Sequence, residues 1–214
     1  MTGNVAERLQ AIRGLEPLVE SERRSASIKD CKAGGYLKFE NETWQIRRLM
    51  RYLDVKWSTF KKRKTDYWIT ELELFGLVTG ATRYIEWELD DELEIAVTTD
   101  IVELRDINYK GKPVKHQDLE DIAYEEEGEV RLKGVTYSYD EDETWAGLYY
   151  PDENGGESLR MRAYEFCGPK DKTFLTIEAW LDEDGERPER EAFVSRPVKR
   201  SEIEVLQPGP SGNA

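Results

Sequence analysis

The sequence predicts a mainly β protein: two pseudo-repeated antiparallel β units forming a sandwich or open barrel, with an N-terminal α-helix. Two observations predict this class. Short runs of β-branched and aromatic residues are separated at short intervals by acidic or glycine turns, as in all-β folds. In addition, Ile85-Glu86-Trp87 is echoed about ninety residues later by Ile177-Glu178-Ala179-Trp180. With 214 residues, 38% of them hydrophobic, the chain can bury a core.

The first segment, residues 1–34, is expected to be a helix followed by a polar linker. Asn4 and Glu7 have the spacing of a reciprocal helix cap. The apolar residues that follow the cap fall on one helical face: Val5, Leu9 and Ile12. Gly14 and Pro17 interrupt the helix, because both residues are unfavourable in a helix interior. The sequence leaves open whether this helix docks on the β body or pairs with another chain.

The first β unit is expected over residues 35–111. It opens with a hairpin at residues 36–46 about an Asn-Glu turn, and it continues with strands over Tyr67–Phe75 and Glu94–Thr99. One segment fits two structures. Several apolar residues in 43–61 recur at helical spacing, so this segment is either an amphipathic helix or, as we prefer, a strand and loop: Ile46, Met50, Leu53, Trp57 and Phe60.

A connector over residues 112–127, with one helical turn near Leu119 to Tyr124, is expected to join this unit to a second β unit over residues 128–206. The second unit also opens with a hairpin, over Arg131–Tyr139. Residues 207–214, rich in proline and glycine, are expected to be a disordered tail.

The two halves need not share a site. The echo contains one extra residue in its second copy, and successive side chains of a strand point to opposite faces. Relative to Trp87, therefore, Trp180 is expected on the opposite face unless a bulge restores the register.

No familiar catalytic, cofactor or metal motif is present, so we expect a non-catalytic protein without a cofactor. The single histidine, His116, lies in the polar connector and is interpreted as a solvated loop residue. Cys31 and Cys167 are interpreted as ordinary thiols of a reducing compartment. Acidic pairs such as Glu86 and Glu88 fit the polar face of a half-buried strand better than a metal or acid-base site.

Charge is divided unevenly along the chain, whose formal net charge is -14. From Arg47 to Lys64, eight cations stand against Asp54 alone, so this segment carries +7 and the rest of the chain -21. The cations alternate with aromatic residues: Trp44, Tyr52, Trp57, Phe60, Tyr67 and Trp68. This mixture suits binding to an acidic protein, an anionic membrane or single-stranded nucleic acid. The alternative without a binding role is a solvated loop whose cations balance the negative charge of the acidic half.

The overall charge argues against double-stranded nucleic acid as a partner. The first twenty residues carry charges that a signal peptide would lack, and no apolar stretch approaches the roughly 20 residues of a spanning helix. We therefore expect a cytoplasmic protein.

The order of strands and their aromatic and acidic positions resemble a known family. The motifs are Trp68-Ile69-Thr70-Glu71-Leu72-Glu73-Leu74, Tyr84-Ile85-Glu86-Trp87-Glu88-Leu89, Gly134-Val135-Thr136-Tyr137 and Leu175-Thr176-Ile177-Glu178-Ala179-Trp180. Over about residues 33–206 the chain resembles the prokaryotic domain of unknown function family 4178. The resemblance implies a duplicated β-rich module without known enzymatic activity, in a family often encoded near membrane-remodelling proteins. The basic stretch Lys61–Lys64 is heavier here than in the family pattern.

Three functions follow as hypotheses. The first is a protein-binding or adaptor module for a basic or membrane-associated partner, which uses acidic strand faces and the basic segment. The second is a small-molecule binder or unrecognised enzyme with a pocket between the β units, lined by Trp87 and Trp180. The third is peripheral binding of anionic lipid through residues 47–64. The candidate binding residues are Arg47, Arg48, Arg51, Lys56, Trp57, Lys61, Lys62, Arg63, Lys64, Trp68, Trp87 and Trp180.

Overall fold

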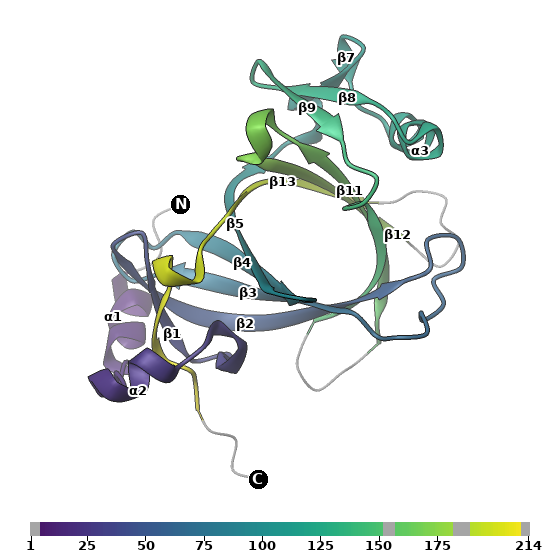
Figure 1. The fold of residues 1–214 in the computed structure, drawn as a ribbon. Helices are drawn as coiled ribbons and strands as arrows, with labels where there is room; N and C mark the ends of the chain where they lie inside the picture. Colours follow the sequence, from purple (N-terminus) through teal and green to yellow (C-terminus); the bar gives the residue numbers. More distant parts are fainter. Residues whose placement is uncertain (1–4, 152–156, 182–188, 211–214) are drawn as a thin grey trace. The chain divides into compact units, whose positions relative to one another are not determined.

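The computed structural model describes residues 5–151, 157–181 and 189–210 (Figure 1). Its α-helices are α1 (Val5–Arg13), α2 (Glu20–Ser25) and α3 (His116–Glu125). Its strands are β1 (Tyr36–Phe39), β2 (Glu42–Val55), β3 (Trp68–Gly76), β4 (Thr82–Leu89), β5 (Leu93–Val102), β6 (Ile107–Tyr109), β7 (Lys112–Pro113), β8 (Glu129–Leu132), β9 (Val135–Tyr139), β10 (Trp145–Tyr150), β11 (Leu159–Cys167), β12 (Phe174–Leu181), β13 (Glu189–Pro197) and β14 (Glu204–Gln207). The expected cap residue Asn4 and the end of the expected tail, residues 211–214, lie outside the described residues.

The prediction of a mainly β protein with an N-terminal helix is confirmed. Hydrogen-bonded neighbours follow the order β14-β1-β2-β3-β4-β5-β13-β12-β11-β9-β8-β6-β7, and β10 pairs with both β11 and β2. This double pairing closes eight antiparallel strands, β2 to β5 and β10 to β13, into a barrel. The barrel is closed, whereas a sandwich or an open barrel was expected. The internal repeat stays a prediction.

Contacts divide the chain into two compact units, which are described separately. Unit 1 consists of residues 1–50, 70–95 and 198–214, and unit 2 consists of residues 51–69 and 96–197. Each unit therefore contains segments from both of the β units that the sequence predicted.

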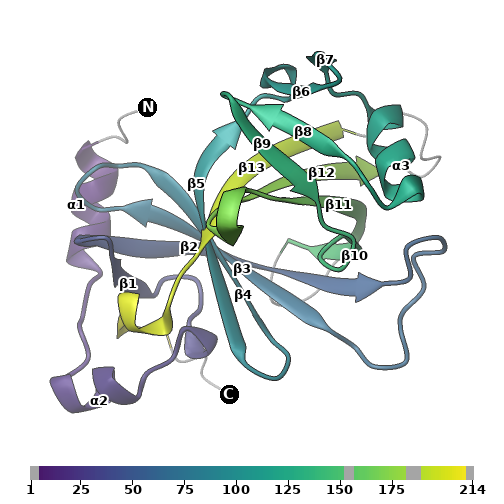
Figure 2. The ribbon, with the colours of Figure 1, turned by 45° about the horizontal axis from the view of Figure 1, so that its top comes forward.

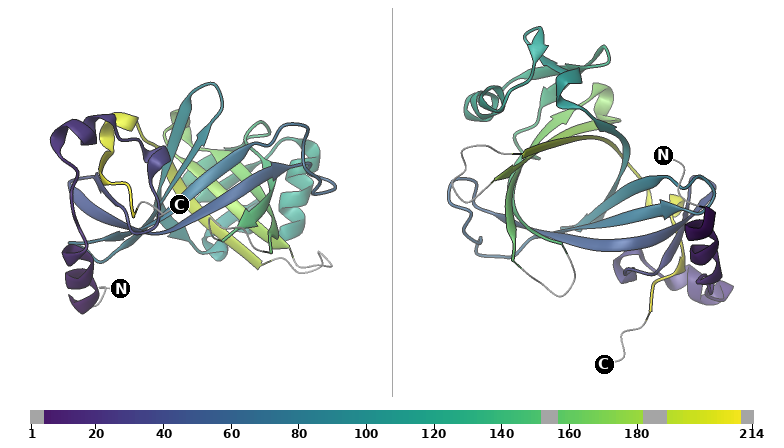
Figure 3. Two further views of the ribbon diagram at one scale, coloured as in Figure 1. Left: turned by 90° about the horizontal axis from the view of Figure 1, so that it is seen from below. Right: turned by 180° about the vertical axis from the view of Figure 1, so that it is seen from behind.

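In unit 1, the expected hairpin of β1 and β2 forms, with its turn one residue earlier than the expected Asn-Glu pair. Glu40 and Asn41 connect the strands with φ of 49° and 61°, the positive values of a two-residue hairpin turn that matches strand twist. The N-terminal helix packs on this unit: the Tyr36 hydroxyl donates a hydrogen bond of 2.6 Å to the carbonyl of Ala11. Figure 3 shows α1 and β1 from two further sides. The helix therefore docks on the β body of its own chain.

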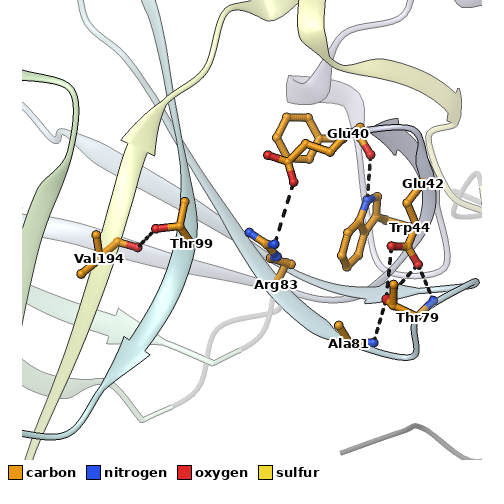
Figure 4. Close-up of polar contacts among 9 residues, drawn as sticks. Glu40, Glu42, Trp44, Thr79, Ala81, Arg83, Thr99 and Val194 are labelled. Atoms are coloured by element: carbon orange, nitrogen blue, oxygen red, sulfur yellow. Dashed lines mark hydrogen bonds and ion pairs between the residues drawn. The ribbon is translucent and has the colours of Figure 1, made fainter. Parts of the chain in front are cut away.

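One carboxylate in unit 1 fixes a turn. Glu42, at the start of β2, accepts hydrogen bonds from the backbone N–H groups of Val78 (3.0 Å) and Thr79 (2.8 Å), in the turn between β3 and β4. Figure 4 shows the contact of Glu42 with Thr79. The Thr79 hydroxyl also donates to this carboxylate. Nearby, Arg83 of β4 pairs at 3.9 Å with Glu40, in the turn between β1 and β2. The turn thus depends on a side chain from another hairpin.

The ambiguous segment 43–61 is a strand up to Val55. Its helical spacing misleads because both faces of β2 are buried: Ile46 and Tyr52 lie on one face and Leu53 and Val55 on the other. A strand apolar on both faces loses the simple alternation that identifies a strand by its pattern.

Unit 2 contains a long antiparallel array of β11, β12 and β13 in unbroken register. One face of this array packs against α3 and the hairpin β8–β9 (Figure 2). The buried cluster between them includes Leu119 and Ile122 of α3, Tyr164 and Phe166 of β11, and Ile177 of β12. Beside the array, the Thr99 hydroxyl donates to the Val194 carbonyl at 3.0 Å, where the pairing of β5 with β13 shifts register.

The helical turn expected in the connector near Leu119 to Tyr124 forms, but the helix is longer than one turn. Residues 116–125 form α3, which buries Leu119 and Ile122 completely. The polar composition concealed the helix because only a narrow apolar stripe faces the core. His116 is the first residue of this helix and is half-buried, so its interpretation as a solvated loop residue is wrong.

In the second copy of the echo, the isoleucine and the tryptophan lie on opposite faces of β12. Ile177 and Ala179 belong to the cluster beneath α3, whereas Trp180 packs on the other face of β12 with Tyr149 and Met161. The register of β12 with both neighbours is regular, so no bulge restores the tryptophan to the first face.

Candidate functional site

The two arginines of the basic segment in unit 1 are engaged within that unit. Arg47 lies over the ring of Phe75, with its guanidinium carbon 3.6 Å from the ring centre, and pairs with Glu7 at 2.7 Å. Arg48 pairs with Glu73 at 3.5 Å. These arginines hold α1 and neighbouring strands in place.

The remaining six cations of the segment lie in unit 2. Arg63 pairs with Asp54 at 2.6 Å, and Lys62 lies 3.9 Å from Asp66. Arg51 lies over the Trp68 ring at 4.1 Å. The other three are exposed: Lys56, Lys61 and Lys64. The +7 segment is therefore partly neutralised by the chain itself and does not act as one block of charge.

Within unit 2, aromatic residues of the β2–β3 loop and the first residue of β3 pack onto β2 and β10. Trp57, Phe60 and Trp68 cover a buried cluster on the outer face of these strands, and Tyr150 of β10 contacts the Trp68 ring at 5.6 Å. All four rings remain partly exposed. Because aromatic residues with partly exposed faces contribute strongly to interfaces, this arrangement is the first requirement of a binding surface.

Two arginines of β11 complete the surface. Arg162 lies over Trp57 at 4.7 Å and Phe60 at 5.6 Å, and Arg160 lies over Phe60 at 5.7 Å. We define the cation-aromatic surface by Arg51, Trp57, Phe60, Trp68, Tyr150, Arg160 and Arg162. Guanidinium groups held against aromatic faces can still donate hydrogen bonds at their edges, so the surface can receive carboxylates.

A half-buried polar cluster holds Arg162 in place. Glu120 of α3 accepts hydrogen bonds from the Arg162 guanidinium at 2.6 Å and from the hydroxyl of Tyr164, and its carboxylate lies 3.8 Å from the His116 ring. The Tyr164 ring packs edge-on against Trp57 at 5.5 Å. Helix α3 is thus linked through Glu120 to the surface that Trp57 and Arg162 form.

The electrostatics of this cluster follow from burial. Burial is the main cause that raises the pKa of Tyr164, assisted by Glu120, so the hydroxyl stays protonated and donates. Burial also lowers the pKa of His116; Arg190 and Arg162 act in the same direction, and Glu120 opposes them. His116 is therefore held in its neutral form, and its Nδ1 atom is buried without a hydrogen-bond partner among the described residues.

Trp87 and Trp180 belong to different units. In unit 1, Trp87 is half-buried, and its indole nitrogen has no hydrogen-bond partner within the described part of the chain. In unit 2, Trp180 contacts Tyr149 at 5.0 Å. A shared role for the two tryptophans stays a prediction.

Sequence reasoning missed the contribution of β10 and β11 to the surface. Arg160 and Arg162 alternate with Leu159 and Met161, a period-two pattern that places both cations on one face. That signal is present, but their approach to the aromatic residues depends on the pairing of β10 with both β11 and β2. Glu120 carried no local signal.

The model of one protein family matches residues 32–200. The chain belongs to the family described as a domain of unknown function (DUF4178). The matched part of this DUF4178 chain includes β1 to β13 and α3, so the cation-aromatic surface and its supporting cluster lie inside the family domain, and α1 and α2 lie outside it. No curated protein and no solved structure matches the chain.

The described part of this DUF4178 chain has neither a metal-binding cluster nor a membrane-spanning helix. Among the described residues, there is no group of three or more histidine, cysteine or acidic side chains placed to hold a metal ion. Over the same residues, no helix has both the length and the apolar composition needed to cross a membrane.

Proposed function

We propose that this DUF4178 domain is a non-catalytic protein-binding module, an adaptor that receives an acidic segment of a membrane-associated protein on its cation-aromatic surface. The observation that carries the proposal is the stacking of Arg51, Arg160 and Arg162 over partly exposed aromatic rings. Arginine and aromatic residues are the types most enriched in the energetic centres of protein interfaces.

The surface is also held in a fixed geometry. The side chain of Arg162 is only 18% exposed and is bound to Glu120, so little conformational entropy remains to be lost when a partner binds. Exposed lysines on the neighbouring loop, Lys56, Lys61 and Lys64, would attract an acidic partner and accelerate association.

A protein partner fits the charge better than a membrane or a nucleic acid does. Five of the eight cations in 47–64 pair with, or stack on, groups of the chain, which leaves few for a lipid surface or a phosphate backbone. The net charge of -14 opposes both polyanions over longer distances. A short acidic segment of a partner protein, with one apolar anchor residue, needs complementary charge only where it contacts the surface.

The test compares two charge-matched variants in affinity capture from a lysate of the source organism. The first variant, Lys61→Glu with Arg160→Glu, reverses Arg160 of the surface and an exposed lysine beside it. The control, Lys29→Glu with Lys32→Glu, reverses two exposed cations of unit 1. We expect a protein captured by the wild type and the control, with recovery by the surface variant reduced at least about tenfold because like charges then oppose the partner.

The captured protein is then purified and titrated against the three forms. Equal affinity for the wild type and the surface variant would contradict the proposal. Binding of the wild type to phosphatidylglycerol vesicles or to an oligothymidylate, with the same dependence on Lys61 and Arg160 and no protein partner, would assign the surface to lipid or to single-stranded nucleic acid instead.

A further inference from the structure

His116 is the only histidine of the chain, and histidine is the side chain whose ordinary pKa lies closest to neutral pH. It begins α3, and its ring is half-buried. The Nε2 atom of the ring lies 3.8 Å from Oε1 of Glu120, one turn further along the helix. His116 is not part of the cation-aromatic surface, but it is separated from Arg162 of that surface by this single carboxylate.

The same oxygen atom of Glu120 is shared by two other donors. Oε1 accepts a hydrogen bond of 2.6 Å from Nη1 of Arg162 and a second one from the hydroxyl of Tyr164. A carboxylate oxygen offers two lone pairs, so these two donors occupy it. A protonated His116 would be a third donor beside this atom. Proton uptake by His116 therefore weakens at least one of the two existing bonds.

Of the two donors, Arg162 is the one that can move. Tyr164 is fully buried, and its burial keeps the hydroxyl protonated by raising its pKa, so this donor stays in place. The side chain of Arg162 is 18% exposed and reaches the molecular surface. Its Nε atom is buried without a hydrogen-bond partner among the described residues, so the guanidinium is not held at that atom.

The charges around His116 favour the same movement. Among the described residues, the charged groups that act on His116 are Glu120 of α3, Arg162 of β11 and Arg190 of β13. Both arginines stand opposite Ala179 of β12, in one row on the face that α3 covers. Two arginines beside one carboxylate already leave an excess of positive charge, and a protonated His116 increases it. Movement of Arg162 towards water would relieve the repulsion.

A movement of Arg162 changes the cation-aromatic surface directly. The guanidinium carbon of Arg162 lies 4.7 Å from the ring centre of Trp57 and 5.6 Å from that of Phe60. These rings lose a cation from their faces when Arg162 turns away. In contrast, the stacking of Arg51 on Trp68, at 4.1 Å, belongs to the same surface but does not involve Glu120.

We propose that His116 is a pH-sensitive switch for the cation-aromatic surface: proton uptake by His116 releases Arg162 from Glu120. In the neutral form, Arg162 is held over Trp57 in the fixed geometry that favours binding. In the acidic form, Arg162 is mobile, and the affinity for an acidic partner falls. This regulation of binding rests on the proposed function, whereas the release of Arg162 itself requires no partner.

The test is nuclear magnetic resonance of the full chain without a partner, from about pH 8 to about pH 5. The imidazole signals report His116 without ambiguity because the chain has no other histidine. We expect the Nε–H signal of Arg162 and the indole N–H signal of Trp57 to change with the midpoint of His116, below about pH 6.5. The indole signal of Trp68 is the internal control and should not follow this midpoint.

Two variants complete the test. His116→Gln is expected to keep the signals of Arg162 and Trp57 at their neutral-pH positions throughout the titration. Glu120→Gln, which lacks the shared negative charge, should show the released Arg162 signal already at pH 7.5. The inference is overturned if the signals of Arg162 and Trp57 stay in place while His116 titrates, or if they change equally in His116→Gln, a comparison that holds even where Glu120→Gln fails to fold.

The regulation of binding is measured separately with the captured protein. Between pH 7.5 and pH 5.5, affinity should fall at least about threefold more for the wild type than for His116→Gln. Equal falls for the two forms would overturn the regulation and leave the proposed function standing. Failure to capture any protein would contradict the proposed function alone, because the resonance signals are recorded without a partner.

Discussion

Arg162 connects the interior of unit 2 to its surface. One side of its guanidinium binds Glu120, and its face covers Trp57 and Phe60. Replacing it would remove a cation and also leave Glu120 with one charged partner fewer in a half-buried site. The residue therefore acts on both the stability of the α3 contact and the binding surface.

His116 makes a pH-dependent contribution to stability. Burial, with Arg190 and Arg162, holds its pKa below the ordinary value, and Glu120 opposes the shift. Below a pH of about 6.5, the unfolded chain takes up a proton that the folded protein resists. The contribution of His116 to the free energy of unfolding is therefore fully present above this pH. It is lost as the pH drops through the pKa of His116 in the folded protein. Chemical denaturation from pH 7.5 to 5 should show a smaller decline in His116→Gln; parallel curves for the two proteins would contradict this assignment.

Arg63 stabilises the ionised form of Asp54. Burial is the main cause that raises the pKa of Asp54, and Arg63 works against that shift. Arg63→Gln should raise this pKa further and destabilise the protein by roughly 0.5–1 kcal/mol at pH 7, a value that allows for the 49% exposure of Arg63. At about pH 3, where Asp54 is protonated in both forms, the difference should shrink. A difference of the same size at both pH values would assign the effect to packing.

At the scale of elements, the β3–β4 turn depends on Glu42 from β2. This carboxylate accepts two backbone N–H groups and the Thr79 hydroxyl. Glu42→Ala should lower the free energy of unfolding by about 1.5–3 kcal/mol, the range for hydrogen bonds to a charged acceptor. Glu42→Gln, which keeps one acceptor oxygen, should lose less. Urea denaturation measures the free energy of unfolding of both variants. Equal losses in the two variants would show that the charge of Glu42, and not its hydrogen bonds, stabilises the turn.

The elements that the sequence predicted well are those with a local signal. The hairpin turns at Glu40-Asn41 and Lys133-Gly134 contain residue types that tolerate positive φ, and both turns form. Helix α3 was underestimated because its apolar stripe consists mainly of Leu119 and Ile122 amid charged residues. Local pattern is weak wherever tertiary packing decides the structure.

At the scale of the whole molecule, the closure of the barrel and the composition of the site were beyond sequence reasoning. Both depend on β10, which pairs with β2 from far earlier in the chain and brings Tyr150 beside Trp68. The segment 47–64 was correctly recognised as rich in cations and aromatic residues, but its division between two units, and the neutralisation of Arg47 by Glu7, are long-range facts. The spacing of apolar residues along the sequence does not indicate which distant segments lie in contact.

The most direct measurement of the central claim is site-specific photo-cross-linking in cells of the source organism. A photoreactive residue at position 61 lies beside the cation-aromatic surface, and one at position 29 lies in unit 1. We predict that position 61 forms a covalent adduct with one protein, that Arg160→Glu in the same chain abolishes the adduct, and that position 29 does not form it. Equal adducts from both positions, or adducts only to lipid or nucleic acid, would contradict the account.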